Sequence, residues 1–182
     1  MKKLALAAAL LPALASAAGL TGTTVVLDYT YDSGTQVFQT QDSVVVAAGT
    51  ELSCPGSANV CQILSAPTQS LDFGDSSIRY DYVGLNGNTA GFSDVPVNRI
   101  AFSSLFDSGT VITGVQLSTD IVGLDSSRLS FTAHGLTLDL RALPLGSQSF
   151  FQLSLQTAPV PEPASAALLL GGLALLAARR RN

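Results

Sequence analysis

Few residues of this chain could take part in chemistry. Its 182 residues include two cysteines, one histidine and no tryptophan. Cys54 and Cys61 stand close together around Pro55-Gly56, and in an exported chain this spacing predicts a disulfide that closes a surface loop. A zinc site would need two further ligands, which His134 alone cannot supply. We therefore predict a Cys54–Cys61 disulfide and no metal site.

A catalytic site is equally hard to assemble. A Ser–His–Asp triad could use only His134, and the chain contains no Gly-x-Ser-x-Gly nucleophile elbow. Paired carboxylates for glycoside hydrolysis would have to come from aspartates. The candidates are Asp28, Asp72, Asp75, Asp81, Asp94 and Asp139. Two of them, Asp75 and Asp94, flank Gly or Ser, where a carboxylate satisfies the amides of a turn. We therefore expect no catalytic residue, no cofactor and a protein that is not an enzyme.

Two binding hypotheses stay open. Residues 72–77, Asp-Phe-Gly-Asp-Ser-Ser, bring together oxygen ligands that could bind Ca²⁺, although their spacing matches neither an EF-hand nor an RTX loop. The four tyrosines, Tyr29, Tyr31, Tyr80 and Tyr82, could contact sugar rings. Their alternate positions in two apolar stretches favour a place in the hydrophobic core instead.

The charge distribution excludes several classes of partner. Charged residues make up only 12% of the chain. Between the two ends, residues 18–157 hold four arginines and twelve acidic residues, a formal charge of −8. Such a body repels nucleic acids and anionic lipids, and it is compatible with association with cations. We therefore expect no nucleic-acid partner.

Apolar and polar residues alternate with a period of two through much of residues 18–157, which predicts β-strands that each have one solvent-exposed face. In one of these strands Val111, Thr113, Val115 and Leu117 should share a face. Turn signals such as Asp32-Ser33-Gly34 separate the strands. The expected strands are 25–31, 36–40, 43–47, 78–82, 100–104, 111–117, 129–133, 136–140 and 151–155. We predict an all-β domain, an antiparallel, jelly-roll-like β-sandwich, with an up-and-down barrel as the alternative.

The N-terminal residues 1–17 have the pattern of a secretory signal peptide. Lys2 and Lys3 precede an apolar run at 4–14, which should form the signal helix, and Ala15-Ser16-Ala17 follows. Small residues at the −3 and −1 positions fit the signal peptidase, so Ala15 and Ala17 predict cleavage after residue 17. Cleavage after Ala18 is the alternative.

The C-terminal residues have a second, distinct pattern. Val160-Pro161-Glu162-Pro163 leads into fifteen mostly apolar residues, 164–178, and then into Arg179-Arg180-Arg181. A helix of that length covers about 22 Å, which is short of a hydrocarbon core of about 30 Å. Arginines at its end can reach the headgroups and favour the cytoplasmic side. We predict a transmembrane helix preceded by an extended, unpaired strand at Val160 and Glu162.

In this order the three parts of the tail resemble the PEP-CTERM sorting signal. The resemblance implies recognition by an exosortase in a Gram-negative bacterium that makes exopolysaccharide. Together with the patterns described above, the resemblance divides the chain into a signal peptide at 1–17, a β domain at 18–157 and a sorting signal at 158–182. It also implies a chain that signal peptidase and exosortase process during export. The chain would be anchored transiently in the inner membrane, with its body outside the cytoplasm.

Two functions follow for the exported β domain. The first is a structural or adhesive protein of the cell surface or extracellular matrix, associated with the exopolysaccharide of a biofilm. The second is a carbohydrate-binding or polysaccharide-active protein on a jelly-roll scaffold, with Ca²⁺ as a possible requirement. A β-sandwich scaffold hosts both classes. The scarcity of Trp, His and Glu favours the first.

Overall fold

The computed structural model describes residues 18–62, 68–106, 109–160 and 170–173. The expected signal peptide with Ala15 and Ala17 lies outside the described residues. The same holds for Pro161, Glu162 and Pro163, for the basic cluster Arg179, Arg180 and Arg181, and for most of the expected transmembrane helix. Among the described residues, no helix has the length and hydrophobicity needed to cross a membrane.

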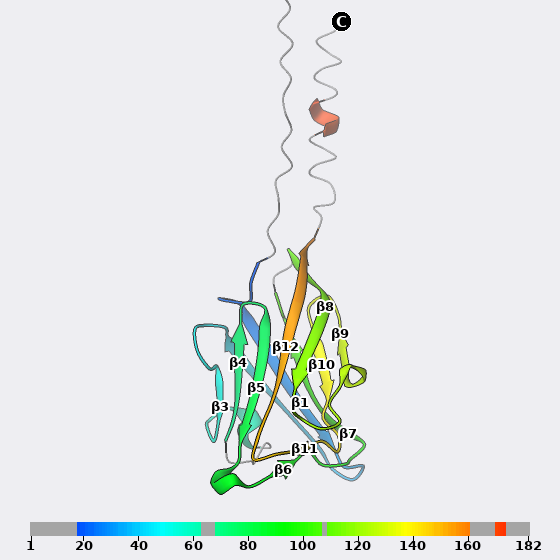
Figure 1. Ribbon diagram of the computed structural model, residues 1–182. Helices are drawn as coiled ribbons and strands as arrows, with labels where there is room; N and C mark the ends of the chain where they lie inside the picture. The colour runs from blue at the N-terminus through cyan, green and yellow to red at the C-terminus, as the bar shows by residue number, and fades with distance from the viewer. Residues whose placement is uncertain (1–17, 63–67, 107–108, 161–169, 174–182) are drawn as a thin grey trace, which may run out of the picture.

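Two five-stranded antiparallel sheets form the body (Figure 1). Sheet A has the order β2 (Val37–Val45), β1 (Thr24–Asp32), β7 (Val97–Ser103), β10 (Leu136–Asp139) and β9 (Leu129–Phe131). Sheet B has the order β3 (Leu52–Cys54), β4 (Gln69–Gly74), β5 (Ser77–Val83), β12 (Gln148–Pro159) and β8 (Thr110–Thr119). The remaining elements are the pair β6 (Ala90–Gly91) and β11 (Pro144–Leu145), and the 3₁₀ turns η1 (Asn59–Gln62), η2 (Leu85–Gly87) and η3 (Ser126–Arg128).

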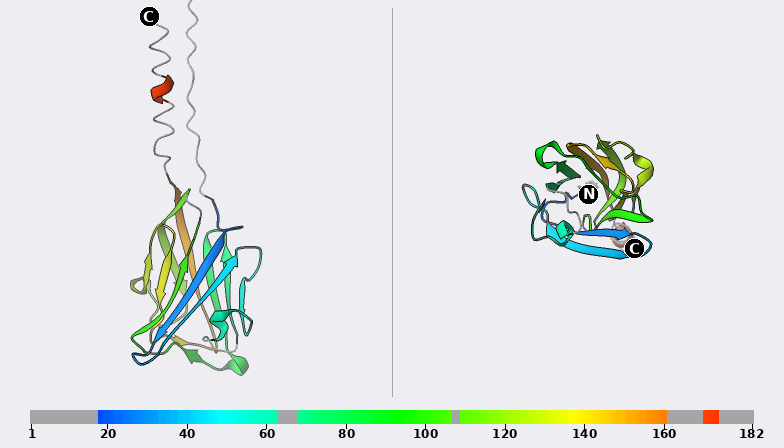
Figure 2. Two further views of the ribbon diagram at one scale, coloured as in Figure 1. Left: turned by 180° about the vertical axis from the view of Figure 1, so that it is seen from behind. Right: turned by 90° about the horizontal axis from the view of Figure 1, so that it is seen from below.

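The inner faces of the two sheets share one hydrophobic core, around which the strands are arranged (Figure 2). Phe73 of sheet B meets Phe102 of sheet A edge to face, with ring centroids 5.8 Å apart. Edge-to-face packing is a favoured geometry for aromatic pairs. Each inner face follows from strict alternation. In β5, for example, Ile78, Tyr80 and Tyr82 are buried while the residues between them face outward.

The all-β class and the antiparallel pairing predicted from the sequence are confirmed. An up-and-down barrel is excluded because strands distant in sequence are neighbours, as β1 is with β7 and β5 with β12. Assignment to a β-sandwich of the jelly-roll type stays a prediction. The expected segments 36–40 and 43–47 form one continuous strand, β2. Strands β3, β4, β6 and β11 were not expected.

Strand β8 departs from the expected alternation. In its first half Ile112 is buried in place of Val111 and Thr113, whereas Val115 and Leu117 do pack against the core. The cause is a β-bulge, because the register with β12 shifts by one residue at this point and makes Thr113 the extra residue. An extra residue moves every side chain beyond it to the opposite face.

Candidate functional site

The Cys54–Cys61 disulfide is present, with its Cα atoms 5.2 Å apart. Cys54 ends β3 of sheet B, and Cys61 lies in η1. The Asp42 carboxylate on β2 of sheet A accepts hydrogen bonds from the backbone N–H groups of Asn59 and Val60 in η1, each at 2.8 Å. The closed loop therefore ties an edge strand of one sheet to an edge strand of the other.

The tyrosines serve the core. Three of the four are buried, namely Tyr29, Tyr80 and Tyr82. The Tyr29 hydroxyl donates to Asn98 Oδ1 at 2.7 Å, and burial, with a smaller effect of Tyr31, raises the pKa of Tyr29 to about 12. The Tyr80 hydroxyl donates to Gln69 Oε1 at 2.6 Å. These phenols are held as neutral hydrogen-bonding groups inside the domain, where they cannot stack on a sugar.

The possible calcium segment forms the tip of a β-hairpin. Phe73 is buried in the core, and β4 ends at Gly74 just before the turn. The Asp75 carboxylate accepts hydrogen bonds from Thr21, from Oγ1 at 2.6 Å and from N at 3.2 Å, and these bonds lower the pKa of Asp75. In the described part of the chain, no three His, Cys, Asp or Glu side chains lie together as a metal site requires. The geometry gives the calcium hypothesis no support.

His134 also has a local structural environment. Its Nδ1 atom lies 3.3 Å from the carbonyl oxygen of Leu105, whose N–H donates to the His134 carbonyl at 3.0 Å. No ion pair of its ring with a carboxylate is found among the described residues. This arrangement lacks the carboxylate that would orient a catalytic imidazole.

The two ends of the described body meet at the start of β8. The Ala18 N–H donates to Thr110 Oγ1 at 3.0 Å, and the Val160 N–H donates to the carbonyl of Gly109 at 2.9 Å. Figure 1 shows β12 reaching the end of the domain at which β8 begins. Val160 is therefore tied to the sheet, which corrects the expectation that it belongs to an unpaired strand. Ordered pairing reaches the residue before Pro161.

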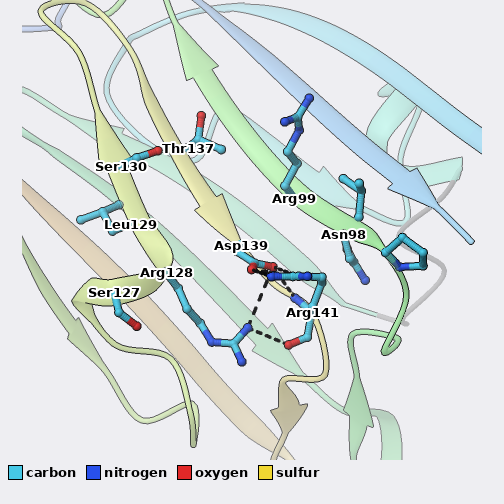
Figure 3. A pocket seen from close by; sticks show the side chains of 11 residues that line it. Asn98, Arg99, Ser127, Arg128, Leu129, Ser130, Thr137, Asp139 and Arg141 are labelled. Carbon is cyan, nitrogen blue, oxygen red and sulfur yellow. Dashed lines mark hydrogen bonds and ion pairs between the residues drawn. The ribbon is translucent and has the colours of Figure 1, made fainter.

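The outer face of sheet A carries two adjoining hollows. One, of about 560 Å³, lies over β2, β1 and β7, and it reaches β10. The other, of about 390 Å³, lies over β7, β10 and β9 and is shown in Figure 3. Arg99 of β7 and Thr137 of β10 line both hollows. The hollows therefore form one continuous polar surface across the sheet.

The strand register sets the side chains of this surface in rows. In one row Gln39 pairs with Thr30, Thr30 with Arg99, and Arg99 with Asp139. The next row consists of Gln41, Asp28, Ala101, Thr137 and Ser130. Cross-strand neighbours lie about 5 Å apart at Cβ. Ala101 is the smallest side chain of its row, which leaves depth beside Arg99.

Both carboxylates of this surface are engaged within the protein. Arg141 donates from Nη2 to Asp139 Oδ2 at 2.6 Å and from Nε to both carboxylate oxygens at 2.9 Å, and Arg128 lies 3.9 Å from the same group. The hydrogen bonds from Arg141 hold the pKa of Asp139 below its ordinary value. Asp28 accepts a hydrogen bond from Gln41 Nε2 at 2.8 Å.

Arg99 differs from these neighbours. It is exposed, and among the described residues its guanidinium takes part in no hydrogen bond or ion pair that would neutralise it. Figure 3 shows the Arg99 side chain turned away from Asp139, although the two residues are paired across the strands. Arg99 was not among the site residues predicted from the sequence. The sequence feature that could have identified it is an arginine at an outward-facing position of a strand, β7, that contains no acidic residue.

Comparison with known proteins identifies the tail. Residues 159–182 match the family model of the PEP-CTERM protein-sorting motif. Neither the curated proteins nor the solved structures contain a match to the chain. The resemblance of the tail to this sorting signal is thus confirmed, and it marks an exosortase-sorted protein that is exported to the surface or the extracellular space.

Proposed function

Because the chain carries this sorting motif, we propose that its mature body is a structural or adhesive protein of the cell surface or extracellular matrix, held close to exopolysaccharide. The sorting motif is the observation that carries the proposal. The body suits an exposed location, since its formal charge of −8 favours solubility and its disulfide ties two sheet edges together.

We further propose that the protein works without catalysis. Four of the six candidate aspartates are engaged within the protein: Asp28 by Gln41, Asp75 by Thr21, Asp81 by Arg79, and Asp139 by Arg141. Signal peptidase and exosortase are its proposed partners during export, with transient anchoring in the inner membrane through residues 164–178. The mature body then remains with the polysaccharide outside the cell.

Glu162 offers the sharpest test, because it is the only charged residue between Thr157 and Ala178. Glu162→Gln keeps the shape of the side chain and removes its charge, whereas Glu162→Asp keeps the charge. The full chain with an internal tag would be followed by pulse-chase and by fractionation into membrane, polysaccharide and soluble material. We expect the wild type and Glu162→Asp to mature and to appear in the polysaccharide fraction, and Glu162→Gln to accumulate as membrane-bound precursor.

The size of the expected defect separates recognition from folding. A carboxylate near a helix N-terminus contributes under about 1 kcal/mol, which is too little to stop maturation by destabilising the tail. Maturation of Glu162→Gln at the wild-type rate would contradict recognition through this charge. Mature wild-type protein found only in soluble material, free of polysaccharide, would contradict the proposed matrix role.

A further inference from the structure

The positive charge of the body is concentrated on one face. Only four arginines and no lysine occur in residues 18–157, against twelve acidic residues. Three of these four arginines, Arg99, Arg128 and Arg141, line the hollow over β7, β10 and β9. Asp139 is the only acidic residue that lines it with them. This hollow is thus locally cationic within a predominantly acidic body, and such surfaces attract anions. Asp28, which lines the adjoining hollow, is occupied by Gln41.

Within this surface Arg99 is the cation available to a ligand. Arg141 is committed to Asp139, and its hydrogen bonds to Asp139, with a smaller effect of Asp94, raise the pKa of Arg141. Arg128 donates to the Arg141 carbonyl at 2.7 Å. The guanidinium of Arg99 has no such partner among the described residues and points into the open hollows (Figure 3). A guanidinium offers a planar set of donors that matches a carboxylate in a bidentate geometry.

The side chains next to Arg99 can hydrogen-bond to the hydroxyl groups of a ligand. Gln39 and Thr30 follow it in one cross-strand row, and Thr137 lies beside it in the next. Amide and hydroxyl side chains both donate and accept hydrogen bonds. With strands about 4.8 Å apart, the face from β2 to β9 measures about 19 Å. That length exceeds a single sugar, so the face can contact several units of a chain that crosses the strands.

We propose that the outer face of sheet A binds an acidic polysaccharide, with Arg99 holding the carboxylate of one sugar unit and Gln39, Thr30 and Thr137 contacting hydroxyls next to it. This inference rests on the proposed function and names its ligand. Neutral glycans fit the face less well, because three of the four tyrosines that could stack on sugar rings are buried in the core. A carboxylated polysaccharide instead supplies a negative charge that can pair with the Arg99 guanidinium.

Arg99→Gln tests the site, and Arg79→Gln is a matched control. Both variants remove one positive charge from the body, but Arg79 lies on sheet B, where Asp81 already pairs with it. The processed protein, purified from producing cells, would be titrated with polygalacturonate, with dextran sulfate and with neutral dextran. We expect Arg99→Gln to raise the Kd for polygalacturonate at least tenfold, Arg79→Gln to change it less than twofold, and Arg99→Lys to fall between them.

The other outcomes overturn the inference in distinguishable ways. Equal weakening by Arg99→Gln and Arg79→Gln would mean attraction to net charge and no site at Arg99. Tighter binding of neutral dextran than of polygalacturonate would contradict recognition of a carboxylate. Tighter binding of dextran sulfate than of polygalacturonate would indicate that the ligand is a sulfated chain. Fractionation of the same variants keeps the proposed function separate. If Arg99→Gln fractionates with exopolysaccharide as wild type does, only the proposed site at Arg99 is contradicted. If wild type itself is absent from that fraction, the proposed function is contradicted.

Discussion

The outer faces of the two sheets use the same residue type in opposite ways. On sheet B, Arg79 donates from Nε and Nη2 to the two oxygens of Asp81, each at 2.7 Å, and from Nη1 to Gln152 at 3.3 Å. Its guanidinium carbon also lies 4.7 Å from the centre of the Phe150 ring. On sheet A, Arg99 has no comparable set of partners among the described residues. Sheet B satisfies its own arginine, and sheet A leaves one for a ligand.

The origin of this difference is a spacing of two residues along the chain. Side chains at i and i+2 of a strand share a face, so Asp81 stands beside Arg79 in β5. Arg141 lies in the turn that follows β10, two residues after Asp139, and reaches back to its carboxylate. The residues two positions from Arg99 are Val97 and Ala101, which offer no charge. Asp139 does pair with Arg99 across the strands, but Arg141 occupies its carboxylate. Arg79 and Arg141 each pair with an aspartate two residues away, and Arg99, which has none there, stays available.

Opening the Cys54–Cys61 loop should give the largest effect, because this loop joins the edges of the two sheets. Replacing both cysteines with serine removes a closed loop of about eight residues, which should lower the free energy of unfolding by about 2–3 kcal/mol on the chain-entropy model. Urea denaturation of the oxidised wild type and the double variant measures the change. We expect hydrogen exchange to accelerate most in η1 and β2, the elements that Asp42 connects.

The pattern of hydrogen exchange shows whether the disulfide acts locally. Strands β5 and β12 lie inside sheet B, away from the loop, and should keep their protection. Uniform acceleration in β2, β5 and β12 would show that the disulfide only limits the unfolded chain and does not hold the edge of sheet A. The outer face of sheet A would then owe its shape to the core alone.

The stability of two charge variants gives a smaller effect and a direct comparison of the faces. Arg79→Gln should lower the free energy of unfolding by about 1 kcal/mol, because it removes an exposed bidentate ion pair and a cation–π contact. Arg99→Gln should change it by less than about 0.5 kcal/mol, because no partner is lost. Chemical denaturation of both variants under one set of conditions decides the matter. A loss for Arg99→Gln as large as that for Arg79→Gln would mean that Arg99 supports the fold, and the two faces would then be alike.

Much of the fold could be predicted because most strands alternate without interruption. Strands β5 and β10 were expected almost to their ends, since every second residue is apolar. Strand β4 was not expected, because Asp72 and Gly74 are poor strand formers and Gln69 is a polar residue on its inner side. The Tyr80 hydroxyl on the neighbouring strand donates to Gln69 Oε1, which helps to hold this polar side chain in the core. A contact between two strands leaves no trace in either strand alone.

The site shows the same limit. The disulfide could be predicted, since two cysteines in an exported chain leave one pairing. The availability of Arg99 needed the structure, because it depends on which arginine takes Asp139. The bulge in β8 likewise depends on the register with β12, which inserts Thr113 and exchanges the two faces of the strand. Patterns within a strand are visible in the sequence, and relations across strands are not.

The smallest predicted effect concerns Asp139 in acid. Its pKa in the folded protein is lowered, first by the hydrogen bonds that Arg141 donates to it. A carboxylate with a lowered folded pKa stabilises the protein above its unfolded pKa of about 3.9, and this contribution disappears as the pH falls through the folded value. As the pH falls below about 4, wild type should therefore lose a contribution to its stability that Asp139→Asn does not possess.

Comparing the two proteins at neutral and at acidic pH isolates the contribution. Near pH 7, Asp139→Asn should be less stable than wild type by under about 1 kcal/mol, since the ion pair is partly exposed. As the pH falls through the lowered folded pKa of Asp139 and the wild-type carboxyl becomes protonated, the difference should shrink. The variant also frees Arg141 beside Arg99, so it should bind polygalacturonate at least as tightly as wild type at pH 7. A stability difference that stays constant from pH 7 to pH 2 would mean that the charge of Asp139 contributes nothing. Weaker polygalacturonate binding by the variant would mean that Asp139 holds part of the site in shape, beyond neutralising its arginines.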